Sequence, residues 1–178
     1  MGHSVFVSMP GPFNDAQTVF AAALDGELKN HGLTPRTLGV TDWDPDAPLT
    51  AIRRLMLESN GLISVAFRRS FIESGESKPG TESVVDLGGN WLTSPWPHIE
   101  VAMAFQIGLP ILILREAGVI DDGVLERGVS GMYLPQFDLE GDDAEGYFQR
   151  PEFQQLVARW VGYVQAVVTA KGEPPRMY

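Results

Sequence analysis

Two short and almost wholly apolar runs constrain the fold of this chain more than any other feature. Residues 60–67 read N-G-L-I-S-V-A-F, and residues 110–114 read P-I-L-I-L. An unbroken apolar run of this length is typical of a strand covered on both faces, as in a parallel sheet, because a half-exposed strand alternates apolar and polar residues. We therefore expect both runs to form central, buried strands.

Strands and helices alternate along the rest of the chain. The other expected strands lie at residues 4–9, 34–40 and near 132–137. The expected helices run from Asn14 or Asp15 to Gly32 and over residues 49–59, 97–107, 121–127 and about 151–171. This order predicts one domain over residues 1–178, with a three-layer α/β architecture and a five-stranded, mainly parallel sheet, flavodoxin-like in the broad sense. The residues expected in the buried strands are Val5, Ile63, Val65, Ile111 and Ile113.

Three loops follow expected strands early in the chain, at residues 10–15, 42–48 and 68–93. Parallel sheets bind ligands at the carboxyl ends of their strands, near the point where the strand order reverses. The third loop has 26 residues, which is long for a connection within a compact domain. We expect this insertion to be mobile without ligand and to cover the site when the site is filled.

Charge and composition narrow the classes of partner. The formal net charge is −10, from 23 acidic and 13 basic residues. Such a balance disfavours binding to nucleic acid or to anionic membranes, although a local basic spot could hold one small phosphate. The chain has no cysteine, which excludes disulfides, thiolate catalysis and cysteine-ligated metal.

Targeting signals and metal-binding patterns are not apparent. The opening M-G-H-S-V-F-V-S does not resemble a signal peptide, and no apolar run approaches the roughly 20 residues that cross a bilayer. The cytoplasm is therefore the expected location. Asp42, Asp44 and Asp46 lack the glycine and the distal glutamate of a calcium loop, so we expect a helix-capping turn there and neither a metal nor a cofactor.

The segment S-P-W-P-H-I-E, residues 94–100, places a carboxylate at the start of an apolar helix. On a helix that begins near Pro97, Glu100 shares its face with Met103, Ala104 and Ile107. Burial would raise the pKa of this carboxyl, and the helix start would lower it. A poorly hydrated carboxylate can attack an electron-poor carbon or stabilise a neighbouring cation. Alternatively, this glutamate is simply one of many found in the first turn of a helix.

Two segments carry a resemblance to a known family. The run S-P-W-P-H-I-E-V-A-M-A-F-Q-I-G-L-P-I-L-I-L resembles the signature of the nucleoside 2-deoxyribosyltransferase-like superfamily, which has a polar residue six before a glutamate, an E-x-x-x-A helix, then G-x-P and an apolar strand. The opening V-F-V-S-M-P-G-P-F-N-D-A-Q is similar to the family's first strand and G-P-F loop. Six residues before the glutamate, this chain has Ser94, where the transferases usually carry aspartate. Ser94 and His98 resemble the branch of the family that hydrolyses nucleoside monophosphates.

The resemblance implies an N-glycosidase that acts on a nucleotide or nucleoside. Glu100 would attack the anomeric carbon through an oxocarbenium-like transition state, giving a ribosyl ester that water resolves. Ser94 and backbone N–H groups at the helix start would hold a 5′-phosphate. His98 would assist catalysis, or else serve as a structural hydrogen-bond partner.

The other candidate substrate-binding residues flank this motif. The Gly11-Pro12-Phe13 loop would pack on base and sugar, although Phe13 could equally be a core aromatic. Trp96, where the family has small residues, would narrow the pocket or stack on a base. Arg68 and its neighbour Arg69 could meet a phosphate or remain solvated charges. The full set of substrate-binding candidates is Ser8, Gly11, Phe13, Arg68, Ser94 and Trp96.

A second resemblance is to Toll/interleukin-receptor (TIR) domains. Those domains also open with V-F-V-S, carry I-x-x-S before their third strand, where this chain has Leu57-Glu58-Ser59, and have an S-x-W-x-x-x-E helix, matched by Ser94, Trp96 and Glu100. This resemblance implies that the same glutamate cleaves the nicotinamide bond of NAD. A nucleotide sensor without catalytic activity is a third possibility, because a fold alone does not fix a function.

Self-assembly is also expected from the first family resemblance. It implies a homo-oligomer in which the last helix or the loops complete a neighbour's site. Trp160 and Tyr163 are expected to be exposed at such an interface.

Overall fold

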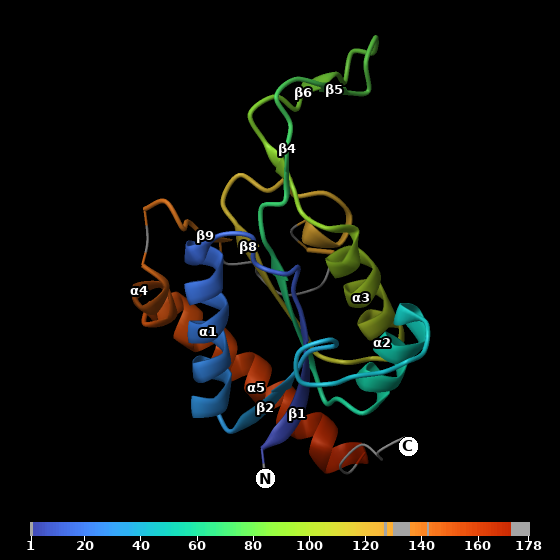
Figure 1. Cartoon of the computed structure of the whole chain (residues 1–178), viewed down its shortest axis with the longest axis vertical. Helices are drawn as coiled ribbons and strands as arrows, with labels where there is room; N and C mark the ends of the chain where they lie inside the picture. The colour runs from blue at the N-terminus through green and yellow to red at the C-terminus, as the bar shows by residue number, and fades with distance from the viewer. Residues whose placement is uncertain (1, 127, 130–135, 142, 172–178) are drawn as a thin grey trace.

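A five-stranded, all-parallel sheet with helices on both faces forms the body of the protein (Figure 1). The computed structural model describes residues 2–126, 128–129, 136–141 and 143–171. The strand order is β2-β1-β3-β8-β9, and the strands are β1 (His3–Ser8), β2 (Leu33–Arg36), β3 (Leu62–Ala66), β8 (Ile111–Glu116) and β9 (Gln136–Phe137). The predicted three-layer α/β architecture is therefore confirmed.

Each face of the sheet carries its own apolar cluster. Helices α1 (Asp15–Asn30), α4 (Ala144–Phe148) and α5 (Pro151–Lys171) pack on one face, and α2 (Pro48–Leu57) and α3 (Pro95–Gln106) pack on the other. β3 and β8 are buried along their whole length, in register from Leu62 beside Ile111 to Ala66 beside Arg115. The five residues predicted for the buried strands are all in the core, as expected for apolar runs covered on both faces.

The order of the strands reverses between β1 and β3. The chain passes from β1 to β2 on one side and then crosses to β3 on the other, so the carboxyl ends of β1 and β3 lie side by side at the switch point. Ser8 and Ser64 are paired there. This is the position at which open parallel sheets bind ligands.

The insertion predicted as a loop is a hairpin arm, here defined as residues 70–92. β4 (Ser70–Phe71) pairs antiparallel with β7 (Trp91–Leu92), and β5 (Glu76–Ser77) pairs antiparallel with β6 (Val85–Asp86). The arm projects from the body, and no side chain in it is buried (Figure 1). The expectation that this segment covers the site stays a prediction.

Several element boundaries differ from those expected. α3 begins at Pro95, two residues earlier than predicted, because Ser94 caps it and proline is well suited to the first helical position. β2 ends at Arg36, because the chain then turns through residues 37–42 with Gly39 at positive φ.

The helix expected at 121–127 is a 3₁₀ turn, η1 (Gly123–Leu125), with Arg127 outside the described residues. β9 covers Gln136 and Phe137, and residues 132–135 of the expected strand also lie outside the described ranges.

The prediction that Trp160 is exposed at an interface is wrong. Its side chain is fully buried in the core, and its indole Nε1 donates to the backbone oxygen of Pro110 at 3.0 Å. α5 can approach the sheet this closely because Gly61 precedes β3: a Cβ atom there would lie 2.7 Å from Val164 and 3.2 Å from Trp160. Tyr163, on the outer side of the same helix, is exposed as predicted. Within the described part of the chain, no helix is long and apolar enough to cross a membrane.

Candidate functional site

A cavity of about 330 Å³ lies at the carboxyl ends of β1 and β3. Three segments form it: the loop after β1, the base of the arm, and the start of α3. The residues that line it are Met9, Pro10, Gly11, Arg69, Ser94, Trp96 and Glu100. The first loop and the S-P-W-P-H-I-E segment, far apart in sequence, thus meet at one cavity.

Glu100 is the buried acid of this cavity, with 7% of its surface exposed. Burial raises the pKa of its carboxyl from the ordinary 4.5 to about 7, and a hydrogen bond with the Ser8 hydroxyl lowers the pKa in part. Because α3 begins at Pro95, Glu100 lies in the second turn and not in the first. The field of a helix start fades beyond the first turn, so desolvation dominates.

The Ser8 hydroxyl is hydrogen-bonded to Glu100 and to a second buried hydroxyl, that of Ser64. Ser8 ends β1, and its Oγ accepts from the Ser64 Oγ on β3 at 3.4 Å, a long hydrogen bond. Both serines are buried. Ser8, a predicted substrate-binding residue, therefore contacts the Glu100 carboxylate and is not among the residues that line the cavity. Ser64 was not predicted, and only the register of β1 on β3 reveals it.

The start of α3 offers few backbone donors to an anion. The first four residues of a helix have N–H groups without helical partners, but Pro95 and Pro97 have no N–H at all. The N–H of Trp96 is bonded to the Ser94 Oγ at 3.3 Å. Of the first three helical residues, two are prolines and the third is already bonded to the cap, so the expected contribution of backbone N–H groups to anion binding is small.

Arg69 is the cation of the cavity. Its Nη1 donates to the Gly11 backbone oxygen at 3.1 Å, and no described carboxylate forms a salt bridge with it. A guanidinium has five N–H donors, which leaves several for a ligand. Among the described residues that line the cavity, Glu100 is the only carboxylate and Arg69 is the only cation.

Arg68, which was predicted to bind substrate, is engaged in other contacts. Its Nε donates to the Ala117 backbone oxygen at 2.6 Å, and its guanidinium also pairs with Glu140 and lies over the Trp91 ring. Adjacent residues of an extended segment face opposite sides, which is why only one of the two arginines reaches the cavity. The sequence shows the two adjacent arginines, but it does not show the register that directs Arg69, and not Arg68, to the cavity.

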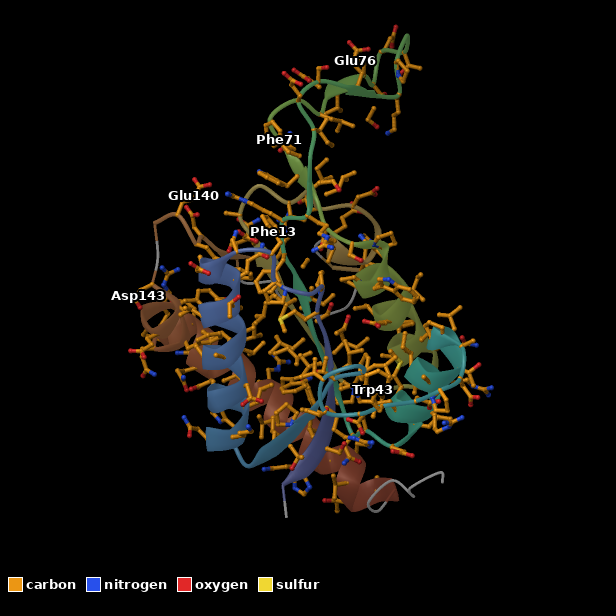
Figure 2. All side chains as sticks on the ribbon, viewed as in Figure 1. Phe13, Trp43, Phe71, Glu76, Glu140 and Asp143 are labelled. Carbon is orange, nitrogen blue, oxygen red and sulfur yellow. The ribbon has the colours of Figure 1, made fainter. Side chains whose placement is uncertain are left out.

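The structure brings together some of the predicted site residues and not others. Gly11, Ser94, Trp96 and Glu100 line the cavity. Phe13 and His98 do not: Phe13 is half exposed at the end of the body from which the arm projects (Figure 2), and His98 lies beside η1, where a Cβ on Gly123 would be 3.4 Å from its Nδ1. The catalytic role of His98 is thus a prediction that the cavity geometry does not itself support.

The three aspartates after β2 bind arginines. Asp42 pairs with Arg36, and Asp44 and Asp46 both pair with Arg54. None of them caps α2, whose capping residue is Ala47 without a side-chain bond, so the expected helix-capping turn is not present. Among the residues that the structure describes, no cluster of three or more histidines or acids is placed to hold a metal ion.

The cavity combines a buried carboxylate, a cation and an aromatic ring that is 41% exposed, Trp96. This combination suits a ligand that carries an anionic group, a flat ring and, between them, a carbon that a carboxylate can reach.

Comparison with known proteins shows a shared fold. No protein-family model matches the chain, and no curated protein matches its sequence. The structure of the Clostridium botulinum CMP N-glycosidase BcmB is similar, with a TM-score of 0.50 and 16% identity, over 88% of this chain and 98% of that chain. The TIR domains of the activated Roq1 resistosome, which recognises the pathogen effector XopQ, give a TM-score of 0.42 and 16% identity, over 96% of this chain and 86% of that chain. The sugar isomerase domain of the RpiR transcription factor from Sphaerobacter thermophilus gives a TM-score of 0.42 and 14% identity, over 94% of this chain and 76% of that chain. At 16% identity, the likeness to BcmB is one of fold alone.

Proposed function

We propose that the protein is an N-glycosidase that hydrolyses the bond between base and sugar in a nucleoside 5′-monophosphate or a nucleoside. The observation that carries this proposal is the placement of Glu100, a buried carboxylate at a cavity over the switch point of the sheet. The sequence resemblance to nucleotide hydrolases supports the same chemistry. So does the fold that the chain shares with BcmB, which is named as a CMP N-glycosidase.

Glu100 acts as the nucleophile. One of its carboxylate oxygens bonds to the anomeric carbon as the bond from that carbon to the base nitrogen breaks, and the departing base takes its proton from solvent. Water then cleaves the sugar ester and restores the carboxylate. The Ser8 hydroxyl holds the carboxylate in place and favours its ionised form.

Only the ionised form of Glu100 can attack. With a pKa of about 7, the carboxyl is about half ionised at neutral pH. We therefore expect kcat/KM to rise with pH through about 7, with an acid limb set by Glu100. A poorly hydrated carboxylate is also a stronger nucleophile than a solvated one, which is the chemical benefit of its burial.

Arg69 and Ser94 bind the 5′-phosphate, and Trp96 contacts the base. Arginine suits phosphate because its planar fork of donors matches two phosphate oxygens. The Ser94 Oγ accepts from Trp96 N–H and keeps its own proton to donate. A cavity of about 330 Å³ lies at the lower end of the range for small-molecule sites, which favours a mononucleotide over the larger NAD.

Liquid chromatography of a mixed panel tests the proposal. Nucleoside 5′-monophosphates, nucleosides and NAD are incubated with wild type, with Glu100→Gln and with Glu27→Gln. Glu27 is a matched control because it is buried to a similar extent, at 8% exposed, and contacts His31 and Gln154, none of which lines the cavity.

We expect wild type and Glu27→Gln to release free base from at least one monophosphate. Glu100→Gln should be slower by several orders of magnitude, as is typical when a nucleophile is lost. Release from NAD alone would favour the TIR-like activity. Binding of a nucleotide with no release from any compound would replace the proposal by a nucleotide sensor.

A further inference from the structure

Gln17 is a fully buried carboxamide in the first turn of α1, and both ends of its side chain are bonded. Its Oε1 accepts from the backbone N–H of Phe13 at 3.2 Å. Its Nε2 donates to the backbone oxygen of Arg68 at 3.2 Å and to Oε2 of Glu116 at 3.0 Å. The reversed amide would place a donor against the Phe13 N–H, so this orientation is the one that satisfies every partner.

Glu116 is the second member of the same cluster. It ends β8, is 3% exposed, and accepts from Gln17 and also from the backbone N–H of Arg68 at 2.8 Å. Between them, Gln17 and Glu116 fix both the N–H and the C=O of one residue, Arg68. A buried pair of polar side chains costs desolvation that an apolar pair of the same shape would avoid, so packing alone gives no reason for it.

The backbone groups held by this cluster are adjacent to the cavity. Arg68 precedes Arg69, whose guanidinium lines the cavity and donates to the Gly11 oxygen. Phe13 follows Gly11 by two residues in the loop after β1. The side chain of Gln17 thus joins the two backbone segments that carry the cation of the cavity and the oxygen to which that cation is bonded.

We propose that Gln17 and Glu116 are positioning residues that set the distance between the Gly11 loop and the base of the arm, and so fix where Arg69 meets the anionic group of the substrate. This inference rests on the proposed function for its substrate. Neither residue touches the cavity, and each acts through the backbone of Arg68 or Phe13.

The first test is a KM measurement on Gln17→Met, which keeps the shape of the side chain and removes its hydrogen bonds. The matched control is Gln154→Met, the same change at a part-buried carboxamide whose two bonds, to Glu27 and to the Phe148 oxygen, lie away from the cavity. Gln17→Met should raise KM for a nucleoside 5′-monophosphate by roughly tenfold, with kcat changed much less, because an ill-placed guanidinium loses a charged hydrogen bond. The control should lower thermal stability and leave KM unchanged.

Combination with Arg69→Gln shows whether Gln17 acts through Arg69. The double variant should have a KM close to that of Arg69→Gln alone, because the guanidinium that Gln17 positions is already gone. Glu116→Gln retains an oxygen that can accept both bonds and should keep KM near the wild-type value, whereas Glu116→Met should raise KM as Gln17→Met does.

A readout without substrate separates this inference from the proposed function. The amide of Arg69 bonds to the Leu92 oxygen, not to Gln17, so its hydrogen exchange reports whether the base of the arm has moved. NMR should show that this amide exchanges about tenfold faster or more in Gln17→Met than in wild type or Gln154→Met. Absence of base release from every compound would defeat the proposed function but not this inference. An unchanged KM in an active enzyme, or unchanged exchange of the Arg69 amide where no activity is measurable, would overturn it.

Discussion

Replacing Glu100 by glutamine should stabilise the protein, and the gain should depend on pH. The carboxyl of Glu100 is buried, and its pKa rises from 4.5 to about 7 on folding. The folded state therefore binds this proton more tightly than the unfolded chain does. Below pH 4.5 both states are protonated and the carboxyl contributes no pH dependence; as the pH rises toward 7, the unfolded chain ionises first and the wild type loses stability.

The size of the loss follows from the pKa. At about 1.4 kcal/mol for each pH unit, a rise from 4.5 to about 7 corresponds to roughly 3 kcal/mol, which is lost between those two pH values and is constant above them. Glutamine is neutral throughout and escapes this loss. The free energy of unfolding of Glu100→Gln, minus that of wild type, should therefore increase by about 3 kcal/mol between pH 4.5 and pH 8. For a chain of this length, that corresponds to a relative increase in Tm of roughly 6–12 °C.

Urea titrations followed by tryptophan fluorescence, at half-unit steps from pH 4.5 to pH 8, measure this difference. Subtraction removes the titration of every other carboxyl, because those groups are common to both proteins. Glu145→Gln, an exposed change in α4, serves as the control and should stay within about 0.5 kcal/mol of wild type. A difference between Glu100→Gln and wild type that does not change with pH would refute the claim that the folded protein holds this carboxylate in a poorly hydrated state.

Arg69→Gln should raise KM for 5′-monophosphates by roughly tenfold or more and leave KM for nucleosides nearly unchanged; an equal effect on both would contradict a phosphate contact. Ser8→Ala should move the acid limb of kcat/KM to higher pH by roughly one unit, because the hydroxyl that lowers the pKa of Glu100 is lost, and a pH–rate profile checks this. Trp160→Phe should lower the free energy of unfolding by about 2 kcal/mol in urea, since it leaves a gap in the core and removes the hydrogen bond from the indole to the Pro110 oxygen. Light scattering should show a homodimer or larger oligomer at micromolar concentration, because the arm exposes apolar side chains such as Phe71 and Val85; a monomer would contradict this.

The central sheet could be predicted from the sequence because its signal is local. Residues 60–67 and 110–114 are almost wholly apolar, and burial on both faces explains such runs without further information. The start of α3 at Pro95 was missed by two residues, although a serine before a proline is a common helix start. The arm was not predicted because each of its ladders pairs only two residues on each side, which is too short for an alternating pattern to stand out.

Part of the lining of the candidate cavity could be predicted, and what could not be predicted concerns the orientation of side chains. The segment 94–100 and the loop at Gly11 were correctly expected to meet. The sequence could not show which of two adjacent arginines faces the cavity, because that depends on the register of the chain beyond β3. It also could not show that Trp160 is buried, because the space for its ring depends on Gly61, about a hundred residues away in the sequence.

The arm is attached to the body through its base. The Trp91 N–H donates to the Gly118 oxygen, and the Trp91 oxygen accepts from the Ile120 N–H, both at 2.9 Å. Phe71 pairs with Trp91, and Figure 2 shows that Glu76 lies farther from the sheet than Phe71 does. Because the chain enters and leaves on paired strands, the two ends of the insertion remain neighbours whatever lies between them. The cost of closing such a loop grows only slowly with its length. The arm can therefore lengthen, shorten or change sequence in evolution with little effect on the folding of the sheet, and variation there can alter what approaches the cavity while the buried carboxylate beneath it stays the same.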